Sequence, residues 1–147
     1  MIRIGITGSK GFVGYHLYQT LALYKEEFTL IEFDRKFFEV SRNLDVFVSS
    51  CDVIVHLAAL NRHNNPELIY ETNIGLVKIL IAALERTKSR AHIIISSSTQ
   101  EQKDNLYGKS KKEGRLLFSN WAIQNGGRFS GLIIPNVFGP FGHPYYN

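Results

Sequence analysis

The sequence predicts one α/β domain built around a doubly wound parallel sheet. Three observations lead to this prediction: short runs of apolar residues, longer segments between them with apolar residues at helical spacing, and a glycine-rich turn after the first run. A chain of 147 residues is long enough for a single core that removes roughly 70% of its unfolded surface from water. One domain over residues 1–147 is therefore expected.

The first half of the chain alternates strand and helix. Residues 1–7 form a short apolar run that ends in glycines, and residues 12–24 repeat apolar side chains every three or four positions. A second strand is expected over residues 28–33 and a third over residues 53–58, which read VIVHLA. Such continuous apolar runs are typical of parallel strands that are covered on both faces.

The second half continues the alternation. Helical spacing predicts a helix over residues 67–87 and another over residues 107–124. Between them lies a strand centred on residues 93–95 with their flanks, and the last strand covers residues 129–134. The chain then turns at Pro135, Gly139 and Pro140.

Composition narrows the classes of partner and the compartment. The net charge of +4 comes from scattered basic residues without a long basic run, so a nucleic-acid partner is not expected, and a ligand with phosphates suits the mild positive field. Cys51 is the single cysteine, which gives neither a disulfide framework nor a metal site and fits a reducing cytoplasm. The first apolar run is too short for a signal peptide or a membrane span, so no membrane partner is expected.

The turn after the first strand has glycines at positions 8, 11 and 14. Gly8 permits a tight turn, Gly11 lets the backbone approach a pyrophosphate, and Gly14 allows the helix to pack closely on the strand. The amides that open the helix near Phe12 face the same place with the positive end of the helix dipole. A strand, this turn and a helix predict a Rossmann-like dinucleotide site.

Asp34 lies twenty positions after Gly14, at the expected end of the second strand. A carboxylate there accepts hydrogen bonds from the adenosine ribose, which favours NAD because the same charge repels a ribose phosphate. Arg35 follows directly and is able to pair with that phosphate, so NADP stays open as the alternative.

A second group of polar residues follows the fourth strand. Tyr107 and Lys111 are four residues apart at the start of a helix, so they share one face, and the ammonium favours the phenolate form of Tyr107. Tyr107 is thus a candidate general acid or base. The serines at positions 96–98 stand at the carboxyl end of the strand, where ligands bind in open α/β sheets, and a hydroxyl there is able to hold a substrate oxygen.

Taken together, the motifs resemble the extended short-chain dehydrogenase/reductase family. They are TGxxGxxG, DVIVHLAA from Asp52, Asn73, the serine triplet, YxxxK and PNVFGP, and they span essentially the whole chain. The resemblance implies that Tyr107 is the acid/base, that Lys111 holds the nicotinamide ribose and supports Tyr107, and that Ser98 orients the reacting oxygen.

The same resemblance assigns the binding residues. His56 is expected to pack rather than to catalyse, and the substrate contacts are expected to be Ser98, Thr99 and Asn136. The cofactor contacts, from motif and position together, are Thr7, Gly8, Lys10, Gly11, Phe12, Val13, Gly14, Asp34, Arg35, Leu57, Ala58, Ala59, Asn73, Ser96, Tyr107, Lys111 and Pro135.

Finer motifs point to one group within the family. Members that dehydrate a nucleotide sugar have an acidic pair where this chain has Thr99 and Gln100, which argues against a dehydratase. HLAALNR, SSSTQ, DNLYGKSK, PNVFG and the later PYYN resemble the reductase domain of bifunctional UDP-sugar 4-reductase/3-epimerase enzymes of capsule and O-antigen biosynthesis, which also share the short step from Ser98 to Tyr107. The implied activity is NAD(P)-dependent reduction of a 4-keto-6-deoxy UDP-sugar.

The substrate-binding carboxyl-terminal part and the cupin domain of those enzymes are absent from this sequence, so we expect the amino-terminal part of a longer enzyme. Two other functions stay open: a nucleotide-sugar 4-epimerase that retains NAD, and a non-catalytic NAD(P)-binding module or truncated fragment. Apolar residues on the second long helix, among them Leu116, Leu117, Phe118 and Trp121, belong either to the core or to a homodimer interface formed by the two long helices.

Overall fold

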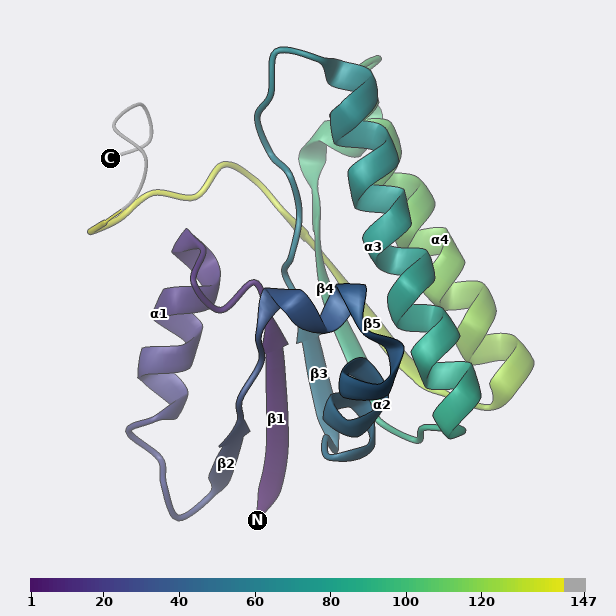
Figure 1. Cartoon of the computed structure of the whole chain (residues 1–147). Helices are drawn as coiled ribbons and strands as arrows, with labels where there is room; N and C mark the ends of the chain where they lie inside the picture. The colour runs from purple at the N-terminus through teal and green to yellow at the C-terminus, as the bar shows by residue number, and fades with distance from the viewer. Residues whose placement is uncertain (142–147) are drawn as a thin grey trace.

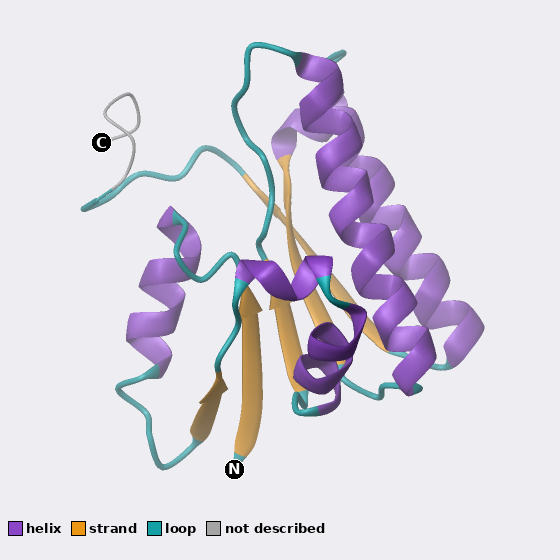
Figure 2. Cartoon of the chain, viewed as in Figure 1, coloured by secondary structure: helices purple, strands orange, loops and turns teal. Residues whose placement is uncertain are grey.

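A computed structural model of the chain describes residues 1–141. It contains a five-stranded, fully parallel sheet in the order β2-β1-β3-β4-β5, as Figures 1 and 2 show. The elements are β1 (Ile2–Thr7), α1 (Phe12–Leu21), β2 (Phe28–Ile31), the 3-10 helix η1 (Arg35–Glu39), α2 (Ser41–Ser49), β3 (Val53–His56), α3 (Pro66–Thr87), β4 (His92–Ser98), the 3-10 helix η2 (Thr99–Gln102), α4 (Leu106–Asn125) and β5 (Arg128–Ile134). The predicted α/β parallel sheet is confirmed.

The helices form two layers around the sheet. Crossovers between parallel strands are right-handed, so the reversal of strand order after β2 moves the later helices to the opposite face from α1. Figure 1 shows α1 on one side of the sheet and α3 and α4 side by side on the other. The core lies under α2, α3 and α4, and its members include Leu44, Phe47, Ile54, Leu80, Ile93 and Phe118.

Local signals fix the ends of the long helices. The Asn65 side chain caps α3 by accepting from the Glu67 amide at 3.0 Å, and the Asn105 side chain caps α4 by accepting from the Gly108 amide at 2.7 Å. Gly126 ends α4 with φ at 63°, a left-handed conformation that costs glycine little.

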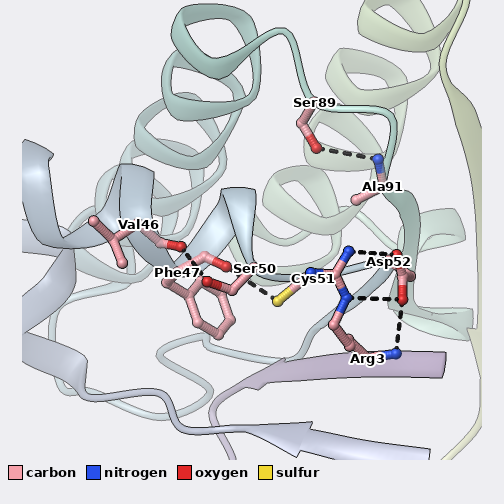
Figure 3. Close-up of polar contacts among 8 residues, drawn as sticks. All are labelled: Arg3, Val46, Phe47, Ser50, Cys51, Asp52, Ser89 and Ala91. Atoms are coloured by element: carbon pink, nitrogen blue, oxygen red, sulfur yellow. Dashed lines mark hydrogen bonds and ion pairs between the residues drawn. The ribbon is translucent and has the colours of Figure 1, made fainter. Parts of the chain in front are cut away.

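An exposed ion pair joins Arg3, near the start of β1, to Asp52, the residue before β3, as Figure 3 shows. The Arg3 guanidinium grips Asp52 through Nε at 3.2 Å and Nη2 at 2.9 Å, and the Arg3 amide donates to the same carboxylate at 2.8 Å. These contacts hold the pKa of Asp52 down at about 2, because Arg3 donates hydrogen bonds to the charged form. Beside it, burial raises the pKa of the Cys51 thiol to about 12, so Cys51 stays protonated.

The structure corrects several boundaries and adds a helix. The first helix ends at Leu21 rather than at residue 24, and the second strand ends at Ile31, so Asp34 lies beyond it. Asp34 caps η1 by accepting from the Lys36 amide at 2.9 Å, which draws the chain out of the sheet early. The sequence analysis did not predict α2, whose buried positions 44, 47 and 48 have helical spacing.

The sequence analysis left open whether the apolar residues of the second long helix belong to the core or to a dimer interface, and the answer differs between positions on α4. Phe118 and Trp121 belong to the core, with 0% and 2% of their surface exposed, whereas Leu116 is 45% exposed. Phe118 stacks on Phe129 of β5 at a centroid distance of 5.9 Å. Among residues 1–141, no helix has the length and apolar character that a membrane crossing requires.

Candidate cofactor and acid/base site

The strand order predicts a ligand-binding crevice at the carboxyl ends of β1 and β3. The chain moves from β1 outwards to β2, and then returns to β3 on the other side of β1, so the order reverses between these two strands. In open α/β sheets, ligands bind at the carboxyl ends of the strands at such a point. Thr7 and His56, the last residues of β1 and β3, are register partners there.

The glycine turn leads from β1 into this crevice. Gly8 has φ at 76°, and a Cβ atom on it would lie 2.7 Å from the Ala58 amide nitrogen, so a glycine is required. A Cβ atom on Gly14 would lie 2.1 Å from the Gly8 carbonyl oxygen, which shows how tightly α1 packs on the turn. The tight turn expected at Gly8 is present, and at Gly14 the helix packs closely on the turn itself; the part of both glycines in cofactor binding stays a prediction.

The opening of α1 offers backbone donors. Gly11 is the N-cap residue without a side-chain cap, and the nearest atom that a Cβ on it would meet is the Gly8 oxygen at 3.3 Å. A depression of about 300 Å³ lies next to it. Its lining comprises Lys10, Gly11, Phe12, Tyr15 and Phe141. Val13 is 37% exposed in the same helical turn.

Thr7 joins the two walls of the crevice. Its hydroxyl accepts from the Leu57 amide at 3.1 Å and the Ala58 amide at 3.2 Å, and it lies 2.7 Å from His56 Nδ1. Because both lone pairs of the hydroxyl accept from these amides, its single hydrogen is left to donate to Nδ1, which places the His56 proton on Nε2. Burial, with the charge of Lys111, lowers the pKa of His56 to about 3, so the ring is neutral and packs as expected. The Thr7 side chain itself is fully buried.

Asn73 holds the segment after β3. Its side chain accepts from the Leu60 amide at 2.7 Å and donates to the Leu60 carbonyl at 3.1 Å and to the Ser110 hydroxyl at 3.3 Å. Ser110 in turn donates to the Tyr107 carbonyl at 2.7 Å. Asn73 therefore ties the loop with Ala59 to the first turns of α4.

The three serines at the end of β4 have separate partners. The Ser96 carbonyl accepts from the Lys111 ammonium at 3.2 Å, and the Ser97 hydroxyl donates to the Glu101 carboxylate. The Ser98 hydroxyl accepts from the Gln100 amide at 3.1 Å and so caps η2. Lys111 thereby brings α4 against the carboxyl end of β4.

Tyr107 and Lys111 lie together on α4. The Lys111 ammonium is 5.8 Å from the centroid of the Tyr107 ring. Burial lowers the pKa of Lys111 to about 8, since the charged form loses contact with water. A cation held in this place is able to stabilise a phenolate on Tyr107.

The remaining predicted positions lie on other elements. Arg35 opens η1 next to the capping Asp34, and Thr99 is exposed at the start of η2. Pro135 and Asn136 are exposed after β5, where the chain crosses the carboxyl ends of the strands toward α1 (Figure 1). His16 Nε2 meets the Pro140 carbonyl there at 2.7 Å. The PYYN stretch lies outside the described residues.

Two residues near the site were not singled out in the sequence: Glu101 and Arg115, which form an ion pair at 2.8 Å. Arg115 stands four residues after Lys111 and eight after Tyr107, so its helical spacing was the available signal. The partner Glu101 had no signal of its own, because η2 is too short to show a period.

The sheet, the crevice and the glycine turn place the chain among Rossmann-like α/β domains. The sequence matches the NAD dependent epimerase/dehydratase family over residues 4–147, and the chain belongs to this family. The family resemblance drawn from the motifs is thereby confirmed.

Individual relatives narrow the comparison. The chain is 32% identical over 149 aligned residues to a UDP-2-acetamido-2,6-beta-L-arabino-hexul-4-ose reductase from Pseudomonas aeruginosa, with 99% of this chain and 38% of the relative covered. It is also 32% identical to the capsular polysaccharide assembling protein CapF from Staphylococcus aureus, with a TM-score of 0.78 over 99% of this chain and 37% of that one. RMD from Pseudomonas aeruginosa, solved with NADPH, shares the fold with a TM-score of 0.85 at 22% identity, covering 99% and 57%. The chain thus spans less than two fifths of the curated relative.

Proposed function

We propose that this chain forms the cofactor-binding and acid/base part of an NAD(P)-dependent reductase that acts on a UDP-linked 4-keto-6-deoxy sugar. The observation that carries the proposal is the Tyr107–Lys111 pair, which Lys111 fastens to the end of β4 through the Ser96 carbonyl. The similarity to a UDP-hexulose 4-reductase supports the choice of substrate.

The residues around the crevice fit a dinucleotide. The α1 amides after Gly11 have no side-chain cap and would face the pyrophosphate, and the depression of about 300 Å³ lined in part by Gly11 leaves room for it. The backbone from Leu57 to Ala59 would lie along the cofactor, and Lys111 would reach the nicotinamide ribose. When bound, the reduced nicotinamide supplies a hydride to the keto carbon of the substrate.

Tyr107 supplies the proton in this proposal. Its O–H bond breaks as the proton moves to the substrate oxygen, so the hydride and the proton together convert the ketone into an alcohol. The Lys111 ammonium stabilises the phenolate that remains, and the Ser98 hydroxyl donates to the substrate oxygen and fixes its direction. General acid catalysis of this kind contributes about 10²- to 10⁴-fold to the rate.

NAD is the proposed cofactor, with NADP as its competitor. One Asp34 oxygen accepts from the Lys36 amide, and its other oxygen is directed to the ribose hydroxyls in this proposal. Arg35 and Lys36 bring positive charge to the same corner. Replacement of Asp34 by asparagine should weaken NAD binding and strengthen NADP binding, as measured by calorimetry with both cofactors. An unchanged ratio of the two dissociation constants would exclude Asp34 as the selector.

Turnover of the full-length protein tests the proposed reaction. The full-length protein is supplied with reduced cofactor and a UDP-4-keto-6-deoxy sugar, and the loss of nicotinamide absorbance is followed. Tyr107→Phe should lose turnover while its cofactor dissociation constant stays unchanged, and Tyr24→Phe, at an exposed site after α1, is the matched control. Cofactor binding without turnover in the wild type would refute the reductase in favour of a binding module, and NAD retained through purification without net consumption would indicate an epimerase.

We also propose a homodimer through the outer faces of α3 and α4. Apolar side chains are exposed on both helices, namely Leu68, Ile79, Leu116 and Ile123. Sedimentation of the wild type and of Leu116→Glu should show a dimer that the charge disrupts. A wild type that sediments as a monomer at all concentrations would exclude this interface.

A further inference from the structure

A shielded carboxylate stands in the short connection between Ser98 and Tyr107. The side chain of Glu101, on η2, is 7% exposed. It accepts from Arg115 Nε at 3.2 and 3.1 Å, from Arg115 Nη2 at 2.8 Å, and from the Ser97 hydroxyl. A guanidinium that grips a carboxylate with two nitrogens fixes direction as well as distance, so this contact is rigid.

Arg115 extends from α4 toward the sheet on the side that holds the acid/base pair. It follows Tyr107 and Lys111 at intervals of four residues, so the three side chains lie along one side of the helix. The stem of Arg115 lies over Gly131 of β5, where a Cβ atom would be 3.1 Å from the Arg115 Cδ. Arg115 therefore contacts η2 through its head and β5 through its stem.

The backbones of η2 and α4 also meet directly. A Cβ atom on Gly108 would lie 1.9 Å from the Gln100 carbonyl oxygen, so the first turn of α4 rests on the backbone of η2. The Asn105 amide group donates to the Gln100 side chain at 3.1 Å. Because the backbone amide of Gln100 donates to the Ser98 hydroxyl, a shift of η2 relative to α4 would move Ser98 relative to Tyr107.

We propose that Glu101 and Arg115 are positioning residues, which hold Ser98 on η2 and Tyr107 on α4 in the relative placement that proton transfer needs. This inference rests on the proposed reductase function. Neither residue contacts the reacting atoms, and both act through the η2–α4 junction. The Arg115 guanidinium also holds the pKa of the Glu101 carboxyl below its usual range, so the pair stays charged at neutral pH.

A second arginine fork in the chain provides a matched control. Arg86 of α3 grips Asp45 of α2 through Nε at 3.2 and 3.1 Å and Nη2 at 2.7 Å, almost the same geometry as the Glu101 pair. This fork joins two helices at the carboxyl end of α3, away from the junction of η2 and α4. Arg115→Met and Arg86→Met therefore remove arginine forks of similar geometry at two different places, with the Glu101 side chain 7% exposed and the Asp45 side chain 29% exposed.

The first arm of the test is kinetic. Arg115→Met should lower kcat about 100-fold with little change in the cofactor dissociation constant or in KM, since a misplacement of about 1 Å has that effect on rate. Arg115→Lys, which keeps the charge but loses the fork, should recover part of kcat, and Arg86→Met should leave kcat unchanged. The inference is overturned if folded Arg115→Met retains wild-type kcat, or if Arg86→Met lowers it equally.

The second arm needs no substrate. Amide hydrogen exchange should accelerate at Gln100 and Gly108 in Arg115→Met and in Glu101→Gln, but not in Arg86→Met, with circular dichroism as the check of folding. Equal exchange in all variants would overturn the positioning role. An inactive wild type would overturn the proposed reductase function but not the positioning role, because hydrogen exchange still shows whether the Glu101–Arg115 pair holds η2 against α4. If Arg115→Met fails to fold, Arg115→Lys and Glu101→Gln supply the same comparison.

Discussion

Replacement of Lys111 by methionine should stabilise the protein while it removes activity. Lowering the pKa of Lys111 from its usual 10.5 to about 8 corresponds to about 3 kcal/mol of desolvation, at about 1.4 kcal/mol for each tenfold change in proton affinity. The variant also loses the hydrogen bond to the Ser96 carbonyl, which is worth about 1.5 kcal/mol for a charged donor. The expected net gain in the free energy of unfolding is about 1 to 2 kcal/mol, because methionine is uncharged and close in length to the lysine stem that it replaces.

The pH dependence separates this mechanism from simple packing. The folded pKa of Lys111 is below the unfolded one, so its cost is complete below about pH 8 and is relieved as the pH rises toward 10.5, where the unfolded chain holds more protons. Urea unfolding across this range should show the wild type less stable than the variant at low pH, with the difference between them closing as the pH rises. The reasoning is refuted if Lys111→Met is less stable at pH 7, or if its difference from the wild type is the same at all pH values.

Three further substitutions test other parts of the fold. Thr7→Val should cost about 1 to 3 kcal/mol in urea unfolding, because the Ala58 amide and His56 Nδ1 lose the hydroxyl, although the Leu57 amide keeps the Thr7 carbonyl as an acceptor at 3.1 Å. Thr7→Ser keeps the hydroxyl and should cost less; equal losses would contradict this. Gly14→Ala should abolish cofactor binding in calorimetry and lower the melting temperature, since its Cβ would lie 2.1 Å from a backbone oxygen, while Gly75→Ala, with open space around it, should not. The wild type should lose stability between about pH 3.8 and 2, as the carboxylate held by Arg3 takes up its proton, and Asp52→Asn should not show this loss. An acid profile of the variant that matches the wild type would show that the pair contributes nothing.

The order of strands and long helices could be predicted because their signals are local. Apolar runs and helical spacing lie within the elements themselves, and the ends of α3 and α4 differ from the prediction by one residue at most. Helix α2 has helical spacing at its buried positions, which the sequence analysis did not use, and its place in the fold is set by a distant contact: Phe47 of α2 packs where Gly5 leaves space on β1. An aspartate at position 34 fits two roles when only the sequence is known, a predicted acceptor for the ribose and a helix cap, and the fold shows the cap.

The candidate site likewise contains some residues that local sequence signals identify and others that only the packing of separate elements brings together. Spacing along one helix places Tyr107 beside Lys111, and the end of an apolar run identifies the serines. The residues that support them are distributed over separate elements, such as Glu101 on η2 and Asn73 on α3, and their hydrogen bonds arise only when these elements pack. A single sequence contains the chemistry of such residues but not their neighbours.

Helix α4 bears both the proposed acid/base residue and part of the core. Tyr107 is in its first turn, while Phe118 and Trp121 are buried farther along the same rigid rod. Warming that loosens the aromatic packing under its second half therefore displaces Tyr107 as well. Heat inactivation of the proposed reductase should coincide with loss of the core rather than precede it, and substitutions that improve the fit around Phe118 should extend the working temperature without any change to the proposed catalytic residues.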